Sequence, residues 1–386
     1  MAYDKVVDSA SLDSKLTQVA DAIRTKGNTS ADLQFPSGFI SAIQAIQTGT
    51  ELQIIVSVTS GATVTATKGS KVVSGTSVNG TCTLTVPEAG TWSVKATLGG
   101  KTSDTKSVTF TDNYALSLSF VSAVLNDNDW ATIKTVSDNG EGANYWSIGD
   151  RKAVTLNGTV GKLSLSNVTT YAFIIGFNHN ASVEGANRIH FQLAKTALSG
   201  GTDVCFCDNQ YAMDSGWSSP GAGYFVMNAS NTNSGGWKSS QMRTNICGTS
   251  LSSYSGTIIA VIPAELRAVL KPVTKYTDNT ANGGGSTASY VTATTDYFFL
   301  LSEYEVFGSI SYGNTNEKNK QAQYAYYSAG NSKIKYKHNG TSTTAFWWLR
   351  SPIVSYSLNF VYVDADGAVN YIGASYSLGF APGFCV

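Results

Sequence analysis

The sequence FWWLRSP at residues 346–352 and the ending APGFCV at residues 381–386 frame the most informative part of the chain. We expect the adjacent Trp347 and Trp348 to pack inside a scaffold, and Arg350 to pair with a buried carboxylate or carbonyl group. Between the two runs, Tyr, Ser, Gly and aliphatic residues follow one another without a clean period of two, unlike the residues of a regular half-buried strand. The pattern predicts a rigid frame around an irregular segment.

Residues 121–386 have the pattern of one α+β domain with short strands and long loops. They hold six of the seven Trp residues and all of the His residues. A helix is predicted at Pro263–Leu270, because Pro suits the first turn of a helix and Pro272 follows its end. The Gly-rich segment Asn279–Ser289 predicts a flexible loop within this domain.

The first 120 residues predict two further parts. Residues 50–120 contain short alternating segments separated by turn signals, with a single Trp92, which is typical of an immunoglobulin-like β-sandwich acting as a spacer. Residues 1–49 predict two short helices whose apolar stripes are Leu12, Leu16, Val19 and Ile23, then Phe39, Ile40, Ile43 and Ile46. Two such helices bury too little surface to be stable alone. We expect them to oligomerise or attach to a larger assembly; packing on the next domain is the alternative.

Composition and charge argue against several classes of protein. The formal net charge is zero and charged residues make up 13% of the chain, so nucleic acid, which requires a basic face, is not an expected partner. Residues 1–10 lack the apolar core of a signal peptide, and no apolar run has the length of a membrane span. We therefore expect synthesis in a cytoplasm and no membrane insertion. The five scattered Cys predict buried free thiols.

The sequence contains no recognisable catalytic or metal-binding constellation. His179, His190 and His338 lie in unrelated contexts, and His190 is expected to be a hydrogen-bonded core residue of a strand. Glu303 and Glu305 would share one face of a strand, where a glycosidase pair could form, although surface or capping carboxylates are commoner. We expect no catalytic residue, no metal and no cofactor.

The two framing motifs resemble the ending of the variable proteins of diversity-generating retroelements. These proteins have a C-type-lectin-like fold of the formylglycine-generating-enzyme subtype. Further motifs that resemble the same domain in phage and gut-bacterial proteins are YWSIGD at 145–150, IIGFNH at 174–179, GGW at 235–237 and LRAV at 266–269. The resemblance implies that residues 121–386 form a C-type-lectin-like ligand-binding domain with a variable region at about 351–380.

A second resemblance lies near the N-terminus. The sequences ADAIR at 20–24 and FPSGFISAI at 35–43 resemble the start of many phage tail proteins. This resemblance implies that the helical segment attaches the chain to other tail proteins or to sister chains.

The amino acids of the C-terminal window fit the diversification that the first resemblance implies. In that family, reverse transcription randomises template adenines, mostly in AAC codons, and changing the first two bases of AAC cannot give Lys, Glu, Gln, Met or Trp. Residues 351–386 contain none of these five amino acids. At the composition of the whole chain, about four or five would be expected in such a window.

The resemblance also implies which side chains contact a ligand. Tyr gives a large contact area at low entropic cost, while Ser and Gly adapt to a partner, as in antibody paratopes. The expected ligand-binding residues are Ile353, Val354, Ser355, Tyr356, Ser357, Leu358, Tyr362, Tyr371, Ile372, Gly373, Tyr376, Ser377 and Leu378. The alternative is that Val354, Leu358, Ile372 and Leu378 are core residues of strands.

These inferences predict a non-enzymatic receptor-binding protein, or adhesin, of a phage tail. It would be located in the virion, made in the host cytoplasm, and bind a host cell-surface protein or glycan as a homo-oligomer, with a trimer favoured. Three alternatives are a retroelement-diversified bacterial surface display protein, an oxidase like the formylglycine-generating enzyme, and a calcium-dependent sugar binder. The last would need carboxylate-amide motifs such as Glu-Pro-Asn, which the sequence lacks. The oxidase chemistry requires a reactive Cys pair near the C-terminal region, where only Cys385 lies.

Overall fold

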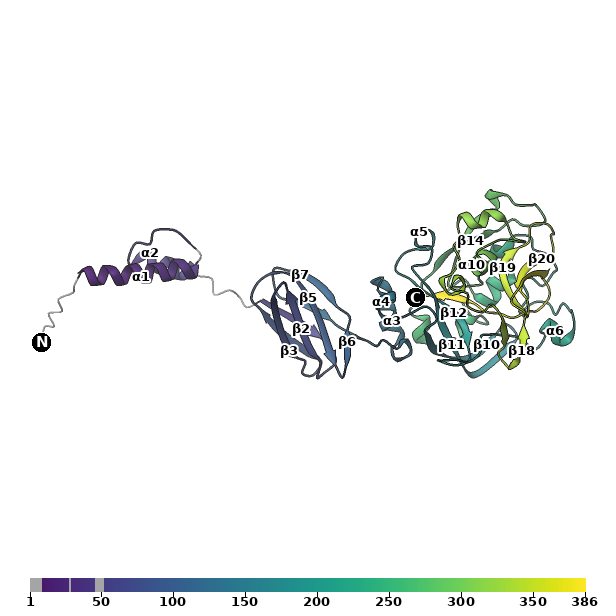
Figure 1. Cartoon of the computed structure of the whole chain (residues 1–386), viewed down its shortest axis with the longest axis horizontal. Coiled ribbons are helices and arrows are strands. Elements are labelled where there is room, and N and C mark those ends of the chain that lie inside the picture. Colours follow the sequence, from purple (N-terminus) through teal and green to yellow (C-terminus); the bar gives the residue numbers. More distant parts are fainter. Residues whose placement is uncertain (1–8, 28, 46–51) are drawn as a thin grey trace. The chain divides into compact units, whose positions relative to one another are not determined.

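The computed structural model describes residues 9–27, 29–45 and 52–386. The chain divides into two compact units, Met1–Phe120 and Val121–Val386. It is a multidomain protein built mainly of β-sheets with few helices (Figure 1). The second unit begins at the residue where the sequence predicts the C-terminal domain.

The N-terminal part consists of helices α1 (Ser9–Gly27) and α2 (Ser37–Ala45), which pack on each other. Their shared core is small and contains Ala20, Ile23 and Phe39. Several apolar residues of the predicted stripes remain exposed, namely Leu12, Val19, Ile40 and Ile43. Ile46 lies outside the described residues. The pair thus leaves much of its apolar surface uncovered within the described structure.

Two β-sheets enclose a second core in residues 52–121. One sheet has the order β4-β1-β8, and the other has the order β3-β2-β5-β6-β9, with β7 also paired to β5. Along β4 and β5, buried and exposed side chains alternate, which places Trp92 in the core. The strands are β1 (Leu52–Ser57), β2 (Thr63–Lys68), β3 (Lys71–Thr76), β4 (Thr81–Val86), β5 (Gly90–Leu98), β6 (Lys101–Ser103), β7 (Lys106–Phe110), β8 (Tyr114–Ser117) and β9 (Phe120–Val121).

The C-terminal unit is built on a five-stranded sheet of order β10-β11-β12-β22-β16 (Figure 1). Its strands are β10 (Arg151–Val160), β11 (Leu163–Phe177), β12 (Ile189–Lys195), β16 (Phe298–Phe299) and β22 (Gly383–Cys385). Every side chain of β12 is buried, as expected where both faces of a sheet are covered. His190 in β12 is a hydrogen-bonded core residue, as predicted, because its Nδ1 lies 3.1 Å from the hydroxyl oxygen of Tyr324.

A three-stranded sheet of order β19-β20-β21 carries the C-terminal window. Strand β19 (Trp347–Pro352) is buried along its whole length, β20 (Asn359–Val363) is central, and the edge strand β21 (Val369–Gly373) is mostly half-buried. The indole N–H groups of Trp347 and Trp348 donate to the carbonyl oxygens of Lys333 and Phe225. Both rings are fully buried, which confirms that they belong to the scaffold.

The remaining strands form small sheets around these two. They are β13 (Val204–Cys205), β14 (Val273–Asp278), β15 (Val291–Asp296), β17 (Lys335–Lys337) and β18 (Gly340–Ala345). The α-helices of this unit are α3 (Trp130–Asp138), α4 (Gly142–Tyr145), α5 (Ala181–Glu184), α6 (Ala212–Ser215), α7 (Gly236–Ser239), α8 (Ile258–Val261), α9 (Ala264–Arg267), α10 (Glu303–Phe307) and α11 (Ala325–Ser328). Short helices of other types are Leu125–Asp127, Met242–Cys247, Ala288–Tyr290 and Thr315–Asn319.

Two local predictions are corrected by the structure. The helix expected at Pro263–Leu270 is shorter, since α9 covers only Ala264–Arg267 after Pro263. Glu303 and Glu305 lie in the helix α10 and not in a strand, because Ser302 and Glu305 form a capping box that starts this helix. Both carboxylates are buried. Among the described residues, no helix combines the length and the apolar character needed to cross a membrane.

Candidate functional site

A buried amide fixes the main chain of the loop at residues 353–358, which connects β19 to β20. The side chain of Asn233 is fully buried. Its Nδ2 lies 3.1, 2.8 and 3.0 Å from the carbonyl oxygens of Ile353, Tyr356 and Asn359. One side chain from outside the window therefore ties together both ends and the middle of the loop.

Other main-chain groups hold the same loop. The N–H groups of Gly285, Asn233 and Ala374 donate to the carbonyl oxygens of Val354, Ser357 and Leu358, at 3.1, 2.8 and 2.8 Å. The Gly-rich segment predicted as a flexible loop thus supplies part of the support, and the Oδ1 of Asn233 accepts from the N–H of Asn282 at 2.9 Å. The bonds to the loop itself use only its main-chain atoms, so they persist when its side chains change.

Most side chains of the loop are directed away from the core. Tyr356 is 56% exposed and Leu358 is 44% exposed, and Ser355 is exposed as well. Val354 and Ser357 are half-buried. Within the described residues, neither Ser355 nor Ser357 uses its hydroxyl group in a hydrogen bond. Apart from the buried Ile353, the loop combines a fixed backbone with side chains that lie outside the core.

Three tyrosines lie side by side at one end of this surface. The ring of Tyr371 in β21 packs against Tyr312 at 4.8 Å and lies 6.1 Å from Tyr356. Tyr312 was not predicted, because it lies outside the window. Its segment is held by Glu303, whose carboxylate accepts the N–H groups of Ser311, Tyr312 and Gly313. Tyr312 adds a fixed aromatic residue to the predicted set.

A second aromatic group surrounds Trp217, which is 49% exposed. Its ring lies 5.5 Å from that of Tyr376 and 6.1 Å from that of Phe346. Tyr376 and Ile372 are half-buried. Trp217 also lies outside the window, and its exposure could not be inferred from the sequence.

Five of the expected ligand-binding residues are buried, and we remove them from the contact surface. Ile353 and Leu378 are core residues, so the alternative holds for Leu378. Tyr362 lies in the central strand β20 and packs on Phe346 and Trp348. Gly373 faces Asn231, whose Oδ1 lies 2.5 Å from the position that a Cβ would take. Ser377 donates to the buried Asp208.

A buried charge cluster links several elements of the C-terminal unit. The Lys275 ammonium in β14 lies 2.6 Å from Glu184 Oε2 and 2.9 Å from Glu305 Oε1, and 2.7 Å from the hydroxyl oxygen of Tyr324. Arg350 forms a bidentate pair with Glu305. This pairing confirms that Arg350 binds a buried carboxylate. Two cations and two carboxylates balance one another, as burial of charge requires.

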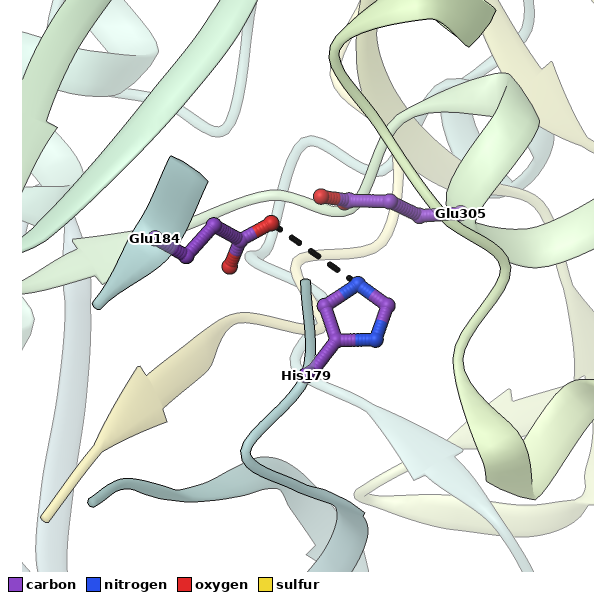
Figure 2. A group of neighbouring side chains, drawn as sticks. All are labelled: His179, Glu184 and Glu305. Atoms are coloured by element: carbon purple, nitrogen blue, oxygen red, sulfur yellow. Dashed lines mark ion pairs between the residues drawn. The ribbon is translucent and has the colours of Figure 1, made fainter. Parts of the chain in front are cut away.

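The same cluster contains three side chains whose spacing would allow them to bind a metal ion. His179, Glu184 and Glu305 bring ligand atoms within 4.8 Å of one another (Figure 2). The Nε2 of His179 lies 3.7 Å from Glu184 Oε1 and makes no hydrogen bond within the described residues. Imidazole and carboxylate groups are zinc ligands. The Lys275 ammonium, however, contacts both carboxylates and supplies the positive charge that a metal would bring. We interpret the cluster as a structural ion network.

Burial strongly disfavours charge on the histidines of this cluster. Burial and the Lys275 charge lower the pKa of His179 to about 3, and the same causes lower the pKa of His190 well below 6.5. Burial also raises the pKa of Glu184 to about 7, although the positive charge of the nearby Lys275 lowers it. At neutral pH both rings are therefore uncharged, which makes them unsuited to act as general acids.

We expect the His179 ring to stay neutral in the folded protein throughout pH 5–8. Below pH 6.5 His179 is protonated in the unfolded chain but stays neutral in the folded protein. Its titration therefore lowers the free energy of unfolding by about 1.4 kcal/mol for each unit that the pH falls. Between pH 4.5 and about 7, Glu184 has the opposite effect on the free energy of unfolding, because its pKa is raised in the folded protein. The two effects overlap in an unfolding experiment, so titration of the His179 ring followed by NMR is the decisive measurement. A ring signal of His179 that shifts with a midpoint near 6.5 would contradict the expectation.

Burial separates the thiols of the chain from solvent. All five Cys are free and buried, as predicted. Cys385 Sγ lies 3.3 Å from His190 Nδ1, yet burial raises the pKa of this thiol to about 12. A reactive thiolate is therefore not formed there at neutral pH.

Comparison with known proteins gives one match. A family model described as a domain of unknown function (DUF6273) matches residues 223–386. No curated protein and no solved structure matches the chain. The matched region contains both Asn233 and the whole C-terminal window.

Proposed function

We propose that this chain is a non-enzymatic receptor-binding protein of a phage tail, whose C-terminal unit has a C-type-lectin-like fold and binds a host surface protein or glycan. The main-chain anchoring of the 353–358 loop is the observation that carries this proposal. Because Asn233 and its neighbours hold only backbone atoms, the side chains at 354–358 are free to vary without loss of the fold. A scaffold of this kind suits a retroelement-diversified surface.

The contact surface we propose is narrower than the one predicted from the sequence. It consists of Val354, Ser355, Tyr356, Ser357, Leu358, Tyr371, Ile372 and Tyr376, with the fixed Tyr312 and Trp217 beside them. Preformed aromatic side chains give binding energy at low entropic cost. Tyr371 is held by Tyr312 and Tyr376 by Trp217, so both rings are ordered before a ligand arrives.

The N-terminal parts serve attachment and spacing in this proposal. The two packed sheets and the buried Trp92 support an immunoglobulin-like spacer. The exposed apolar residues of α1 and α2 support their burial against other tail proteins or sister chains, in a trimer. Several copies on one virion multiply a weak individual affinity.

The buried, protonated Cys385 weighs against the oxidase alternative, because that chemistry requires a reactive thiol. The bacterial surface display protein shares the same binding surface. Only the location of the protein separates it from the tail adhesin, so electron microscopy of virions with an antibody against the sandwich distinguishes the two.

The double variant Tyr356→Ala, Leu358→Ala tests the proposed surface. We expect the purified protein to bind cells of at least one strain in a bacterial panel, and the variant to bind about ten-fold more weakly. Its free energy of unfolding should change by less than about 1 kcal/mol, because both side chains are exposed. Chelation with EDTA should leave binding unchanged.

Tyr114→Ala, a partly exposed tyrosine of the sandwich, is the matched control and should bind like the parent protein. Equal binding by the double variant and the parent, or a large loss of stability in the double variant, would rule out the proposed surface.

A further inference from the structure

The C-terminal unit contains a concave site that shares no residue with the 353–358 loop. It has a volume of about 500 Å³, which is in the range of small-molecule sites. It lies between β17 and the segment at residues 201–203, and its polar lining includes Arg151, Lys195, Asp203, Tyr326, Asn331 and Thr341. Nothing in the proposed adhesin function requires this cavity.

One wall of the cavity is formed by Lys195, Asp203 and Tyr326, whose charges cancel. Lys195 is 5% exposed and forms an ion pair with Asp203. The hydroxyl oxygen of Tyr326 lies 2.9 Å from the Lys195 ammonium and 3.2 Å from Asp203 Oδ2. The three side chains fix one another, so this wall keeps its shape without a ligand, and its net charge is zero.

Two further cations have no carboxylate partner: Arg151, which lines the cavity, and the buried Lys335 of β17, which does not. Arg151 donates through Nη1 to the carbonyl oxygens of Ala197 and Gly200 at 2.7 and 2.5 Å, and its other nitrogens make no hydrogen bond within the described residues. Lys335 is 1% exposed, and its ammonium has no hydrogen-bond partner there. Its chain neighbours Ile334 and Tyr336 line the cavity.

Burial lowers the pKa of Lys335 to about 8, so its ammonium group still carries its charge at pH 7. Its ammonium lies 5.0 Å from the ring centre of Trp347 and 5.5 Å from that of Phe173, where the π faces attract a cation. The carboxylate that raises its pKa is Asp203, which already forms an ion pair with Lys195. The lining thus holds two cations, Arg151 and Lys195, and one anion, Asp203, and the charge of the buried Lys335 adds to this excess. The unpaired buried charge of Lys335 is costly unless an anion offsets it, and Arg151 is half-buried.

We propose that this cavity binds a hydroxylated carboxylate of monosaccharide size, such as a hexuronic acid. The planar Arg151 guanidinium matches a carboxylate in geometry and charge. The amide of Asn331 and the hydroxyl group of Thr341 offer donors and acceptors for sugar hydroxyl groups, and the Tyr336 ring offers an apolar face. Lys335 adds favourable potential from behind the wall. The site is independent of the proposed adhesin function, because none of its residues belongs to the contact surface.

Saturation-transfer NMR and calorimetry with sodium glucuronate test this assignment on the full-length protein. Glucose is the neutral matched probe, and sulfate is the probe for charge alone. We expect glucuronate to bind with a dissociation constant of millimolar order, and glucose and sulfate to bind at least about ten-fold more weakly. The Arg151→Gln variant should lose about ten-fold or more in affinity for glucuronate.

Lys335→Met provides a second variant that should fold, because it removes a buried charge without an ion-pair partner. Its affinity for glucuronate should fall several-fold, whereas the exposed Lys162→Gln should bind like the parent protein. Absence of glucuronate binding would overturn the proposal. So would equal binding of sulfate, which indicates an adventitious ion only, or unchanged affinity in both Arg151→Gln and Lys335→Met. Loss of cell binding in the Tyr356→Ala, Leu358→Ala variant with intact glucuronate binding would show that the two sites are separate.

Discussion

Replacing Asn233 with Ala is expected to lower the free energy of unfolding of the C-terminal unit by about 3–5 kcal/mol. The variant leaves the carbonyl oxygens of Ile353 and Tyr356 without their side-chain donor, and the N–H of Asn282 without its acceptor. The carbonyl oxygen of Asn359 keeps only the N–H of Ile353 as a donor. Each buried polar group without a partner costs about 1–3 kcal/mol. Urea denaturation followed by Trp fluorescence measures the loss, and hydrogen exchange measures the opening of the loop.

Asn231→Ala is the matched control, because Asn231 lies two residues away, is exposed and makes no side-chain hydrogen bond within the described residues. It should change stability by less than about 0.5 kcal/mol. The anchoring argument fails if Asn233→Ala is no more destabilising than Asn231→Ala, or if it leaves exchange at residues 353–359 unchanged.

The frame of the domain could be predicted from the sequence, because its residue types have few stable environments. Adjacent Trp347 and Trp348 bury large apolar surfaces, and a guanidinium that follows them closely, such as that of Arg350, requires a carboxylate or carbonyl partner when it is buried. The structure confirms both expectations. The same reasoning identified His190 as a core residue, since it lies within a run of apolar strand residues.

The exposure of side chains in the window was predicted only in part, because it depends on neighbours that are distant in sequence. Tyr362 and Leu378 have the same residue types as the exposed Tyr356 and Leu358, but they pack against other segments of the unit. No local pattern distinguishes the two pairs. Tyr356 and Leu358 are exposed because the 353–358 loop turns its side chains away from the core.

The supporting residues were missed for a related reason. Asn233 lies 120 residues or more from the carbonyl groups it binds, and Lys275 is 91 residues from Glu184. An Asn or Lys in a loop-rich sequence is most often a surface residue. Their roles follow from long-range contacts that a single sequence does not reveal.

Replacing Arg350 with Met is expected to destabilise the C-terminal unit by about 3–5 kcal/mol, because it leaves a buried carboxylate without its main partner. Arg350 and Glu305 are both fully buried. After the change, two carboxylates share the single Lys275 ammonium. The equilibrium unfolding of the variant at pH 7 measures this effect, and the exposed pair Lys134–Asp138 provides the control, with Lys134→Met costing less than about 0.5 kcal/mol.

The double variant Arg350→Met, Glu305→Leu distinguishes the stability that comes from the Arg350–Glu305 ion pair from the stability that comes from the packing of the Arg350 side chain. It retains Lys275 and Glu184, one charge of each sign, 2.6 Å apart. The charge balance is restored, so the double variant should lose at least about 2 kcal/mol less stability than the sum of the two single variants. Additive losses would mean that Arg350 stabilises the fold through its packing and its bond to the Leu300 carbonyl. In that case the charge cluster would not be the element that holds β19, and the window that follows it, in place.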